Sequence, residues 1–206
     1  ARRRADAALT RLHTAPGLRI GLLGGSFNPA HEGHLHIARV ALQRLNLDQV
    51  WWLVSPQNPL KSESGMAPLE KRLARAREVA DDPRIAVTAI EEELGTRYTA
   101  DTLVALKRRF PGVRFVWLMG ADNMIELPRW KNWRAIMRAV PVAVIARPAY
   151  TIRARVSRAA LIFASARKPT RAAPRLAGMP PPAWVLIEAR LPPAAATRIR
   201  ERGLWP

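Results

Sequence analysis

Cysteine is absent from the 206 residues of the chain. Disulfide bonds and thiolate metal ligands are therefore excluded as sources of stability or chemistry. The absence is compatible with a reducing compartment, and we expect the protein to work in the cytoplasm.

Long apolar runs are also absent. No uninterrupted run approaches the roughly 18 to 20 residues that a membrane-spanning helix needs. Residues 1–17 carry arginines with no apolar segment behind them, which is not the pattern of a secretory signal, although transit peptides have a similar composition. We expect residues 1–17 to form a solvated basic extension and residues 18–206 to form one domain.

Acidic residues are scarce: 16 Asp and Glu stand against 34 Lys and Arg, giving a formal net charge of +18. Such a charge favours nucleic acid, a membrane surface or phosphorylated small molecules as partners. No segment combines aromatic and basic residues in the manner of a single-strand binder. We expect phosphorylated small molecules, with no specific nucleic acid and no membrane. A basic nucleic-acid-binding protein remains the alternative.

Segments typical of strands and of helices alternate along the chain. Short apolar runs predict strands, and apolar residues at steps of three and four predict helices. The predicted strands are 18–23, 49–55, 84–91, 113–120, 140–148 and 184–189, and the predicted helices are 33–46, 68–80, 98–110, 130–140 and 194–203. Residues 151–182, rich in Arg, Ala and Pro, predict a loop-rich stretch with room for a short helix.

This alternation predicts an α/β fold: a doubly wound, mostly parallel, Rossmann-like sheet covered on both faces, with a small C-terminal helical part. In such sheets ligands bind at the carboxyl ends of the strands, near the point where the strand order reverses. The rule places three polar segments on one rim, which are GGSFNPAHEGH (24–34), PQNPLK (56–61) and GADN (120–123).

Two histidines, His31 and His34, stand three residues apart at the start of the helix predicted for 33–46. Gly24 and Gly25 allow the preceding backbone to turn tightly and to approach a ligand closely. The first turn of a helix has N–H groups without intrahelical partners and carries partial positive charge. Both imidazoles project from the same side of that turn, so their N–H groups can donate to phosphate oxygens. The stretch therefore predicts an anion site.

Two other interpretations of the histidine pair stay open. The pair could bind zinc, but zinc needs a third protein ligand and no cysteine can supply it. The histidines could also be structural caps of the helix. The glycine pair alone is weak evidence, because it is neither a G-x-G-x-x-G fingerprint nor a Walker P-loop.

The string GGSFNPAHEGH after a predicted strand resembles the H-x-G-H motif of the nucleotidyltransferase superfamily. GTRYTADTL (95–103) resembles the G-T-x-Y-T-x-x-T-L segment of bacterial nicotinate mononucleotide adenylyltransferases. FVWLMGADN, followed by LPRWKNW, resembles that family's G-x-D and W-x-x-W region. IARPAY resembles its R-P-G-Y turn, and TRIRERG resembles the end of its I-S-S-T-x-I-R motif. The similarity covers most of residues 18–203.

The resemblance implies that AMP passes from ATP to the 5′-phosphate of nicotinate mononucleotide. The products are nicotinate adenine dinucleotide and pyrophosphate, on the route to NAD. The attacking phosphate oxygen is already ionised at neutral pH, so positioning and charge stabilisation suffice without a strong base. We expect Mg²⁺ to arrive with ATP and to have no dedicated protein site.

The resemblance also implies the residues that contact ATP. His31, His34 and Arg200 are the expected catalytic residues, since they would stabilise charge on the α-phosphate and the leaving pyrophosphate. Asp122 would hold a ribose hydroxyl, or alternatively cap a helix. The full ATP set is Gly24, Gly25, Ser26, Phe27, His31, His34, Lys61, Gly120, Asp122, Thr197 and Arg200.

A second set is implied for the mononucleotide. Trp130 would stack on the nicotinate ring, the alternative being a core tryptophan. Backbone N–H groups near Thr96 would bind the carboxylate. The full set is Thr96, Tyr98, Thr99, Trp130, Lys131 and Arg147.

The chain departs from the family pattern in two places. Leu60 precedes Lys61 where the family often has histidine, and residues 194–196 are alanines in place of I-S-S, which removes hydroxyl contacts to the triphosphate. Sister enzymes that use nicotinamide mononucleotide or phosphopantetheine are rivals, although GTRYTADTL and LPRWKNW argue against phosphopantetheine. A nucleotide-binding relative without catalysis is a third rival, and a homo-oligomer is compatible with the sequence.

Overall fold

The computed structural model describes residues 12–56, 65–146 and 148–189. Within these residues a six-stranded sheet has the order β3-β2-β1-β4-β5-β6, and every pair of neighbours is parallel. The strands are β1 (Arg19–Gly25), β2 (Gln49–Val54), β3 (Ile85–Thr88), β4 (Arg114–Gly120), β5 (Val142–Ala146) and β6 (Trp184–Glu188).

The strand order reverses at β1. The chain runs outward through β2 and β3 on one side, then returns to place β4, β5 and β6 on the other side. The sheet is therefore doubly wound, as predicted, and its switch point lies between β1 and β4.

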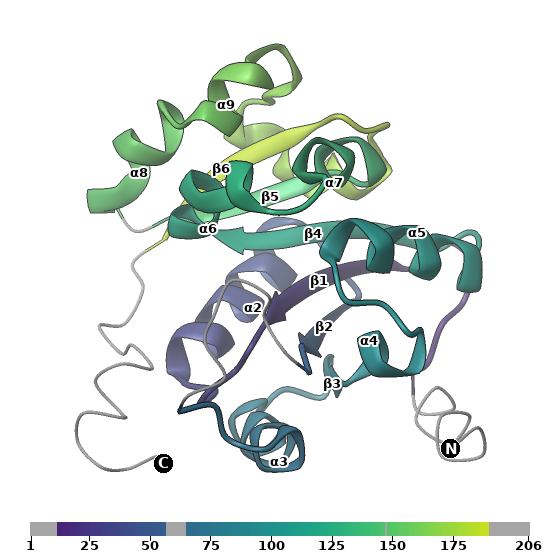
Figure 1. The fold of residues 1–206 in the computed structure, drawn as a ribbon. Coiled ribbons are helices and arrows are strands. Elements are labelled where there is room, and N and C mark those ends of the chain that lie inside the picture. Colours follow the sequence, from purple (N-terminus) through teal and green to yellow (C-terminus); the bar gives the residue numbers. More distant parts are fainter. Residues whose placement is uncertain (1–11, 57–64, 147, 190–206) are drawn as a thin grey trace.

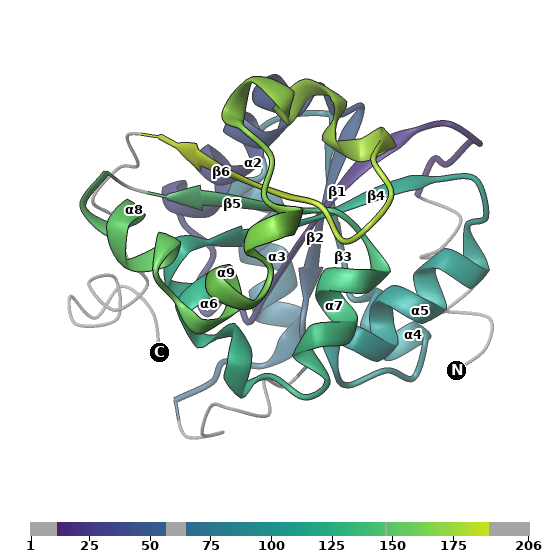
Figure 2. The same cartoon turned by 90° about the horizontal axis from the view of Figure 1, so that it is seen from above.

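Helices cover both faces of the sheet (Figures 1 and 2). One face packs against α2 (Glu32–Arg44), α3 (Leu69–Val79) and the 3₁₀ segment η3 (Thr170–Gly178). The other face carries α4 (Ile90–Glu93), α5 (Thr99–Arg109), α6 (Ala121–Glu126), η1 (Leu127–Arg129), α7 (Trp133–Ala139), α8 (Pro148–Arg155), α9 (Arg158–Ile162) and η2 (Ala164–Ala166).

The core is divided into two layers by the alternation of side chains along each strand. In β2, Trp51 packs on the α5 side while Trp52 packs on the α2 side, and both are fully buried. Because both faces are covered, the strands are continuous apolar runs, which is why they were readable in the sequence. No helix in the described part of the chain is long and apolar enough to cross a membrane.

Several predicted elements have different boundaries. The strand predicted for 84–91 ends at Thr88, and Ile90–Glu93 forms a helical turn whose buried Ile90 imitated a strand residue. The helix predicted for 130–140 begins at Trp133, because Asn132 adopts a left-handed conformation with φ of 53°. Tyr98, rather than Thr99, is the N-cap residue of α5.

Residues 151–182 are more ordered than predicted. They contain most of α8 and the whole of α9, η2 and η3. Their buried positions are largely alanines, such as Ala159, Ala160, Ala172 and Ala173, so the usual period of large apolar residues is missing. The helix predicted for 194–203 lies outside the described residues.

Residues 12–17 pack against the sheet. Leu12 is buried, the Gln49 side chain donates to the His13 carbonyl, and the Gly17 N–H donates to Gly112. The division at residue 17 between an extension and a domain stays a prediction.

Candidate nucleotide site

The predicted rim lies at the carboxyl ends of the three central strands. Gly24 and Gly25 end β1, opposite Leu53 and Val54 of β2, and Gly120 ends β4. The next residue along β2, Ser55, donates its N–H to the Gly25 carbonyl at 2.9 Å. Lys61, Arg147, Thr197 and Arg200 lie outside the described residues, so their roles stay predictions.

His31 and His34 form a reciprocal cap at the start of α2. His31 is the N-cap residue, and its Nδ1 accepts the Gly33 N–H at 3.0 Å. The Nδ1 of His34 accepts the His31 N–H at 3.2 Å, and the two ring centroids are 4.0 Å apart. The capping interpretation is therefore correct, and it brings the two rings together instead of excluding an anion site.

This cap determines where the ring protons lie. An Nδ1 atom that accepts a hydrogen bond carries no proton, so a neutral ring must carry its proton on Nε2. Each Nε2 then acts as an N–H donor and has no lone pair for a metal ion. The pair suits phosphate oxygens and does not suit zinc or Mg²⁺. Among the described residues no cluster of three His, Asp or Glu side chains could hold a metal.

The side chain of Phe27 packs against the ring of His34. The Phe27 backbone is left-handed, with φ of 47°, and its side chain is 1% exposed. The Phe27 ring stacks on Trp52 at 5.2 Å and contacts the His34 ring at 4.6 Å. Phe27 can therefore line a nucleotide only through its backbone, and its side chain positions His34.

Gly24 is required by the close approach of Trp117. A Cβ atom on Gly24 would lie 2.5 Å from Cη2 of Trp117. The Trp117 ring in turn packs edge-on against Trp130, with centroids 6.5 Å apart. Gly24 thus connects the predicted ATP site to the predicted mononucleotide site through two tryptophans.

Gly120 and Asp122 lie together at the start of α6. Gly120 is the N-cap residue, so the alternative role of Asp122 as the cap is wrong. The exposed Asp122 carboxylate lies so close to Gly120 that a Cβ atom on that glycine would overlap its Oδ1.

Two of the predicted mononucleotide residues, Tyr98 and Lys131, meet at the start of α5. The Nζ of Lys131 lies 4.1 Å above the Tyr98 ring. Trp130 is half-buried and precedes α7, whereas Trp133 is buried against Phe163 in the core. Thr96 donates its N–H to the Glu91 carbonyl, and its hydroxyl lies 2.9 Å from that of Thr102.

Two buried ionisable residues near the rim were not anticipated. Burial raises the pKa of Glu91, and hydrogen bonds from Ser55 and Thr102 act in the opposite direction. Arg72 is buried in α3 beneath the turn after β1. The only sequence signal for Arg72 was its place on the buried stripe of α3, four residues before Ala76.

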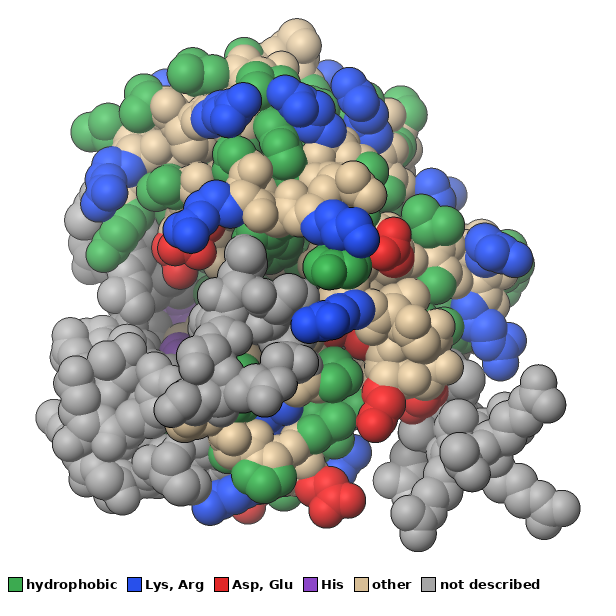
Figure 3. Space-filling view, in the orientation of Figure 1, with side chains coloured by type: hydrophobic (Ala, Val, Ile, Leu, Met, Phe, Trp, Pro, Cys, Tyr) green, Lys and Arg blue, Asp and Glu red, His purple; other side chains and the backbone are tan. Residues whose placement is uncertain are grey.

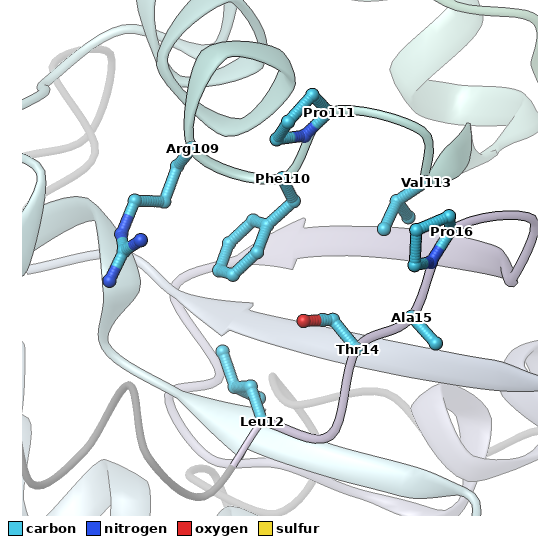
Figure 4. Close-up of a pocket in the computed structure, with 8 residues that line it drawn as sticks. All are labelled: Leu12, Thr14, Ala15, Pro16, Arg109, Phe110, Pro111 and Val113. Atoms are coloured by element: carbon cyan, nitrogen blue, oxygen red, sulfur yellow. The ribbon is translucent and has the colours of Figure 1, made fainter.

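A hollow in the surface lies elsewhere. It has a volume of about 300 Å³ and is bounded by residues 12–16 and 109–113, among them Thr14, Pro16 and Phe110 (Figure 4). These segments precede β1 and β4, at the opposite edge of the sheet from the histidines. None of the predicted site residues lines this hollow.

The family model that describes cytidylyltransferase-like proteins matches residues 22–202. The chain belongs to the cytidylyltransferase-like family. Within it, a protein of Parvibaculum lavamentivorans is 56% identical over 190 residues, which is 92% of this chain and 94% of that protein. A protein of Cereibacter sphaeroides is 55% identical over 186 residues, 90% of this chain and 98% of that protein. Both bear the name "Probable nicotinate-nucleotide adenylyltransferase".

The fold is shared with a solved structure of the Plasmodium falciparum nicotinic acid mononucleotide adenylyltransferase in complex with NaAD. Its TM-score is 0.67 at 15% identity, over 89% of this chain and 83% of that one. These comparisons confirm the nucleotidyltransferase resemblance and the Rossmann-like fold predicted from the motifs.

Proposed function

We propose that this cytidylyltransferase-like protein transfers AMP from ATP to nicotinate mononucleotide, giving nicotinate adenine dinucleotide and pyrophosphate for NAD synthesis. The observation that carries the proposal is the reciprocal cap at the first turn of α2, in which both Nδ1 atoms accept backbone N–H groups and the two ring centroids are 4.0 Å apart. Relatives named for this reaction are more than half identical over nine-tenths of the chain.

The reaction needs little from the protein beyond positioning and charge. A 5′-phosphate oxygen of the mononucleotide attacks the α-phosphorus of ATP, and the bond from that phosphorus to the bridging oxygen breaks. The electron pair leaves with pyrophosphate. His31 and His34 donate to the phosphate oxygens on which negative charge grows, assisted by the N-terminal N–H groups of α2. Asp122 holds a ribose hydroxyl at the end of β4.

Cations complete the ATP site in this proposal. Bound to the phosphates of ATP, Mg²⁺ supplies charge neutralisation. Lys61, Thr197 and Arg200 contact the triphosphate, with Arg200 as the third catalytic residue because a guanidinium stays charged and binds two oxygens at once.

The mononucleotide lies between the starts of α5 and α7. Trp130 stacks on the pyridine ring, supported at its edge by Trp117. Thr96, Tyr98 and Thr99 shape the pyridine pocket, where backbone N–H groups other than that of Thr96 bind the carboxylate. Lys131 and Arg147 add positive charge. We expect this reaction in the cytoplasm, with ATP and nicotinate mononucleotide as partners.

The test is a pyrophosphate-release assay with ATP, Mg²⁺ and either nicotinate mononucleotide, nicotinamide mononucleotide or phosphopantetheine. We expect the highest kcat/KM with the nicotinate. Preference for the amide would contradict the substrate. Absence of turnover, together with RNA affinity that falls steeply with salt, would favour the nucleic-acid alternative.

A further inference from the structure

Arg72 is a buried cation that contacts four backbone carbonyls. Its side chain is 1% exposed. Nε donates to Ala67 at 2.8 Å, Nη1 donates to both Ser26 and Ser55 at 2.7 Å, and Nη2 donates to Pro56 at 2.8 Å. These carbonyls belong to the turn after β1, the turn after β2 and the entry to α3. The guanidinium therefore joins three segments beneath the rim.

Among the described residues, no carboxylate pairs with the charge of Arg72. None of the salt bridges found between described residues includes Arg72. Burial without a counter-charge is unfavourable, and it lowers the pKa of Arg72. An apolar side chain would avoid this cost but would leave the four carbonyls without their donor, so the contribution of the arginine lies in the backbone segments that it joins.

The Ser26 contact orients the next peptide group. A peptide C=O and N–H point in opposite directions across a rigid plane. Because the Ser26 carbonyl points at Arg72, the Phe27 N–H points away from it. The same contact holds Phe27 in its left-handed conformation, which a phenylalanine seldom adopts.

The contact between Arg72 and the Ser26 carbonyl affects His34 through the ring of Phe27. Phe27 lies between Trp52 and His34, with centroid distances of 5.2 Å and 4.6 Å. A change in the backbone of Phe27 would move its ring, and the His34 ring would lose the surface that supports it. A continuous series of contacts thus runs from Arg72 through the Ser26 carbonyl and the Phe27 ring to His34.

Asn28 reinforces the same junction. Its Oδ1 accepts the Ala67 N–H at 3.1 Å and its Nδ2 donates to the Gly65 carbonyl at 2.8 Å. Ala67 is thereby held by Asn28 through its N–H and by Arg72 through its carbonyl.

We propose that Arg72 is a positioning residue for the nucleotide site: its guanidinium sets the Ser26–Phe27 turn and, through the Phe27 ring, the orientation of His34. The proposal rests on the proposed function of the histidine pair. It assigns to α3 a role in ATP binding, although Arg72 touches no substrate.

The kinetic test compares Arg72→Met and Arg72→Lys, with Arg77→Met as a matched control on the exposed side of α3. For Arg72→Met we expect kcat/KM for ATP to fall about 100-fold, the scale of loss caused by small misplacement of catalytic groups. Lysine cannot contact four carbonyls with one ammonium, so Arg72→Lys should fall between wild type and Arg72→Met. The KM for the mononucleotide should change less than about threefold in each variant.

A spectroscopic test does not depend on activity. In ¹⁵N spectra of the imidazoles, wild-type His34 should be the Nε2–H tautomer, and its shifts should change in both Arg72 variants and stay unchanged in Arg77→Met. His13, distant in sequence and exposed, is an internal reference. If Arg72→Met does not fold, Arg72→Lys decides the matter.

Unchanged His34 shifts in a folded Arg72 variant would overturn the proposal. So would equal losses for both substrates with a lowered melting temperature, because that pattern indicates general destabilisation. Should the wild type lack adenylyltransferase activity, the proposed function fails, yet the spectra still test whether Arg72 orients His34.

Discussion

The same two imidazoles cap a helix and, in the proposed function, donate to the phosphates of a ligand. Each Nδ1 is occupied by a backbone N–H of the α2 turn, which directs each ring proton to Nε2. Neither role could be assigned from spacing alone, since capping and anion binding use the same residues. The structure shows the cap, and the cap fixes the tautomer that the proposed phosphate binding needs.

The histidines should each be important for the rate. We expect His31→Ala and His34→Ala each to lower kcat by at least about 100-fold, as for the loss of a charge-stabilising donor. His13→Ala, at an exposed position, is the control and should retain wild-type kcat. Near-wild-type turnover in either test variant would refute the assigned role.

Replacing Trp130 should weaken the binding of one substrate more than that of the other. We expect Trp130→Ala to raise KM for the mononucleotide more than KM for ATP, because its ring stacks on the pyridine. Trp130→Phe keeps an aromatic face and should recover most of the affinity. A larger effect on ATP, measured by initial rates with each substrate varied, would count against stacking.

Glu91 should affect stability in a pH-dependent way. Its pKa is raised in the folded state by burial, so between the unfolded pKa, about 4.3, and the folded value the folded protein binds more protons. The free energy of unfolding contributed by Glu91 therefore falls as pH rises through that window.

As the pH rises from about 5 to about 8, the free energy of unfolding of Glu91→Gln should consequently fall less than that of the wild type, as measured by urea denaturation. Comparing the two proteins cancels the contributions of other groups, such as Asp48, whose pKa is lowered by its hydrogen bond from Arg19. Parallel pH profiles would show that Glu91 does not titrate as inferred.

The burial of ionisable residues and the identity of their partners could not be predicted from the sequence. Arg72 is one of 34 Lys and Arg residues, and its place on the apolar stripe of α3 is the only local feature that separates it from its exposed neighbours Arg75 and Arg77. Its partners are carbonyls of residues up to 46 positions away, so only the tertiary structure identifies them.

The β1–α2 connection is the element on which the site depends. Strand β1 lies at the centre of the sheet, its last residues are glycines, and the turn after it delivers the histidine cap. These features were predictable, because a buried parallel strand, a glycine pair and a helix start each have a local signal. The contact between Gly24 and Trp117 was not, because it joins residues of different strands.

Gly24→Ala tests that contact. The new Cβ would meet Cη2 of Trp117 at 2.5 Å, so Trp117 must shift and Trp130 with it. We expect a loss of about 1 to 3 kcal/mol in the free energy of unfolding, typical of overpacking, and a raised KM for the mononucleotide. The control is Gly178→Ala, where a Cβ would be 3.6 Å from its nearest neighbour. Equal stability of the two variants would contradict the account.

The helices of residues 148–178 were only partly predictable. Local signals for a helix depend on large apolar residues at regular spacing, and here alanines occupy most buried positions. Short helices such as α9 and η2 are defined by packing on α6 and β6 more than by their own sequence. Propensity alone could not give their boundaries.

At the scale of the whole molecule, the doubly wound sheet brings distant motifs to one rim. Segments near residues 24, 55, 96 and 120 follow different strands, and the parallel order aligns their carboxyl ends. The fold class followed from the alternation of elements, and the reaction class from the motifs. Side-chain geometry, such as the tautomers, required the structure.

The net charge is a property of the whole surface. Residues 127–187 contain no Asp or Glu, and Figure 3 shows basic side chains spread over the part of the molecule formed by α7, α8 and α9. We expect this charge to attract polyanions without sequence preference. In anisotropy titrations, the affinity for RNA should fall steeply with salt and be the same for unrelated sequences. Sequence-selective binding that persists in high salt would contradict this expectation.

The most direct test is a crystal structure of the protein with a non-hydrolysable ATP analogue. The account predicts that phosphate oxygens lie within hydrogen-bonding distance, about 2.7 to 3.2 Å, of Nε2 of both His31 and His34. Triphosphate density away from the first turn of α2, or rings rotated so that Nδ1 faces the phosphates, would contradict it.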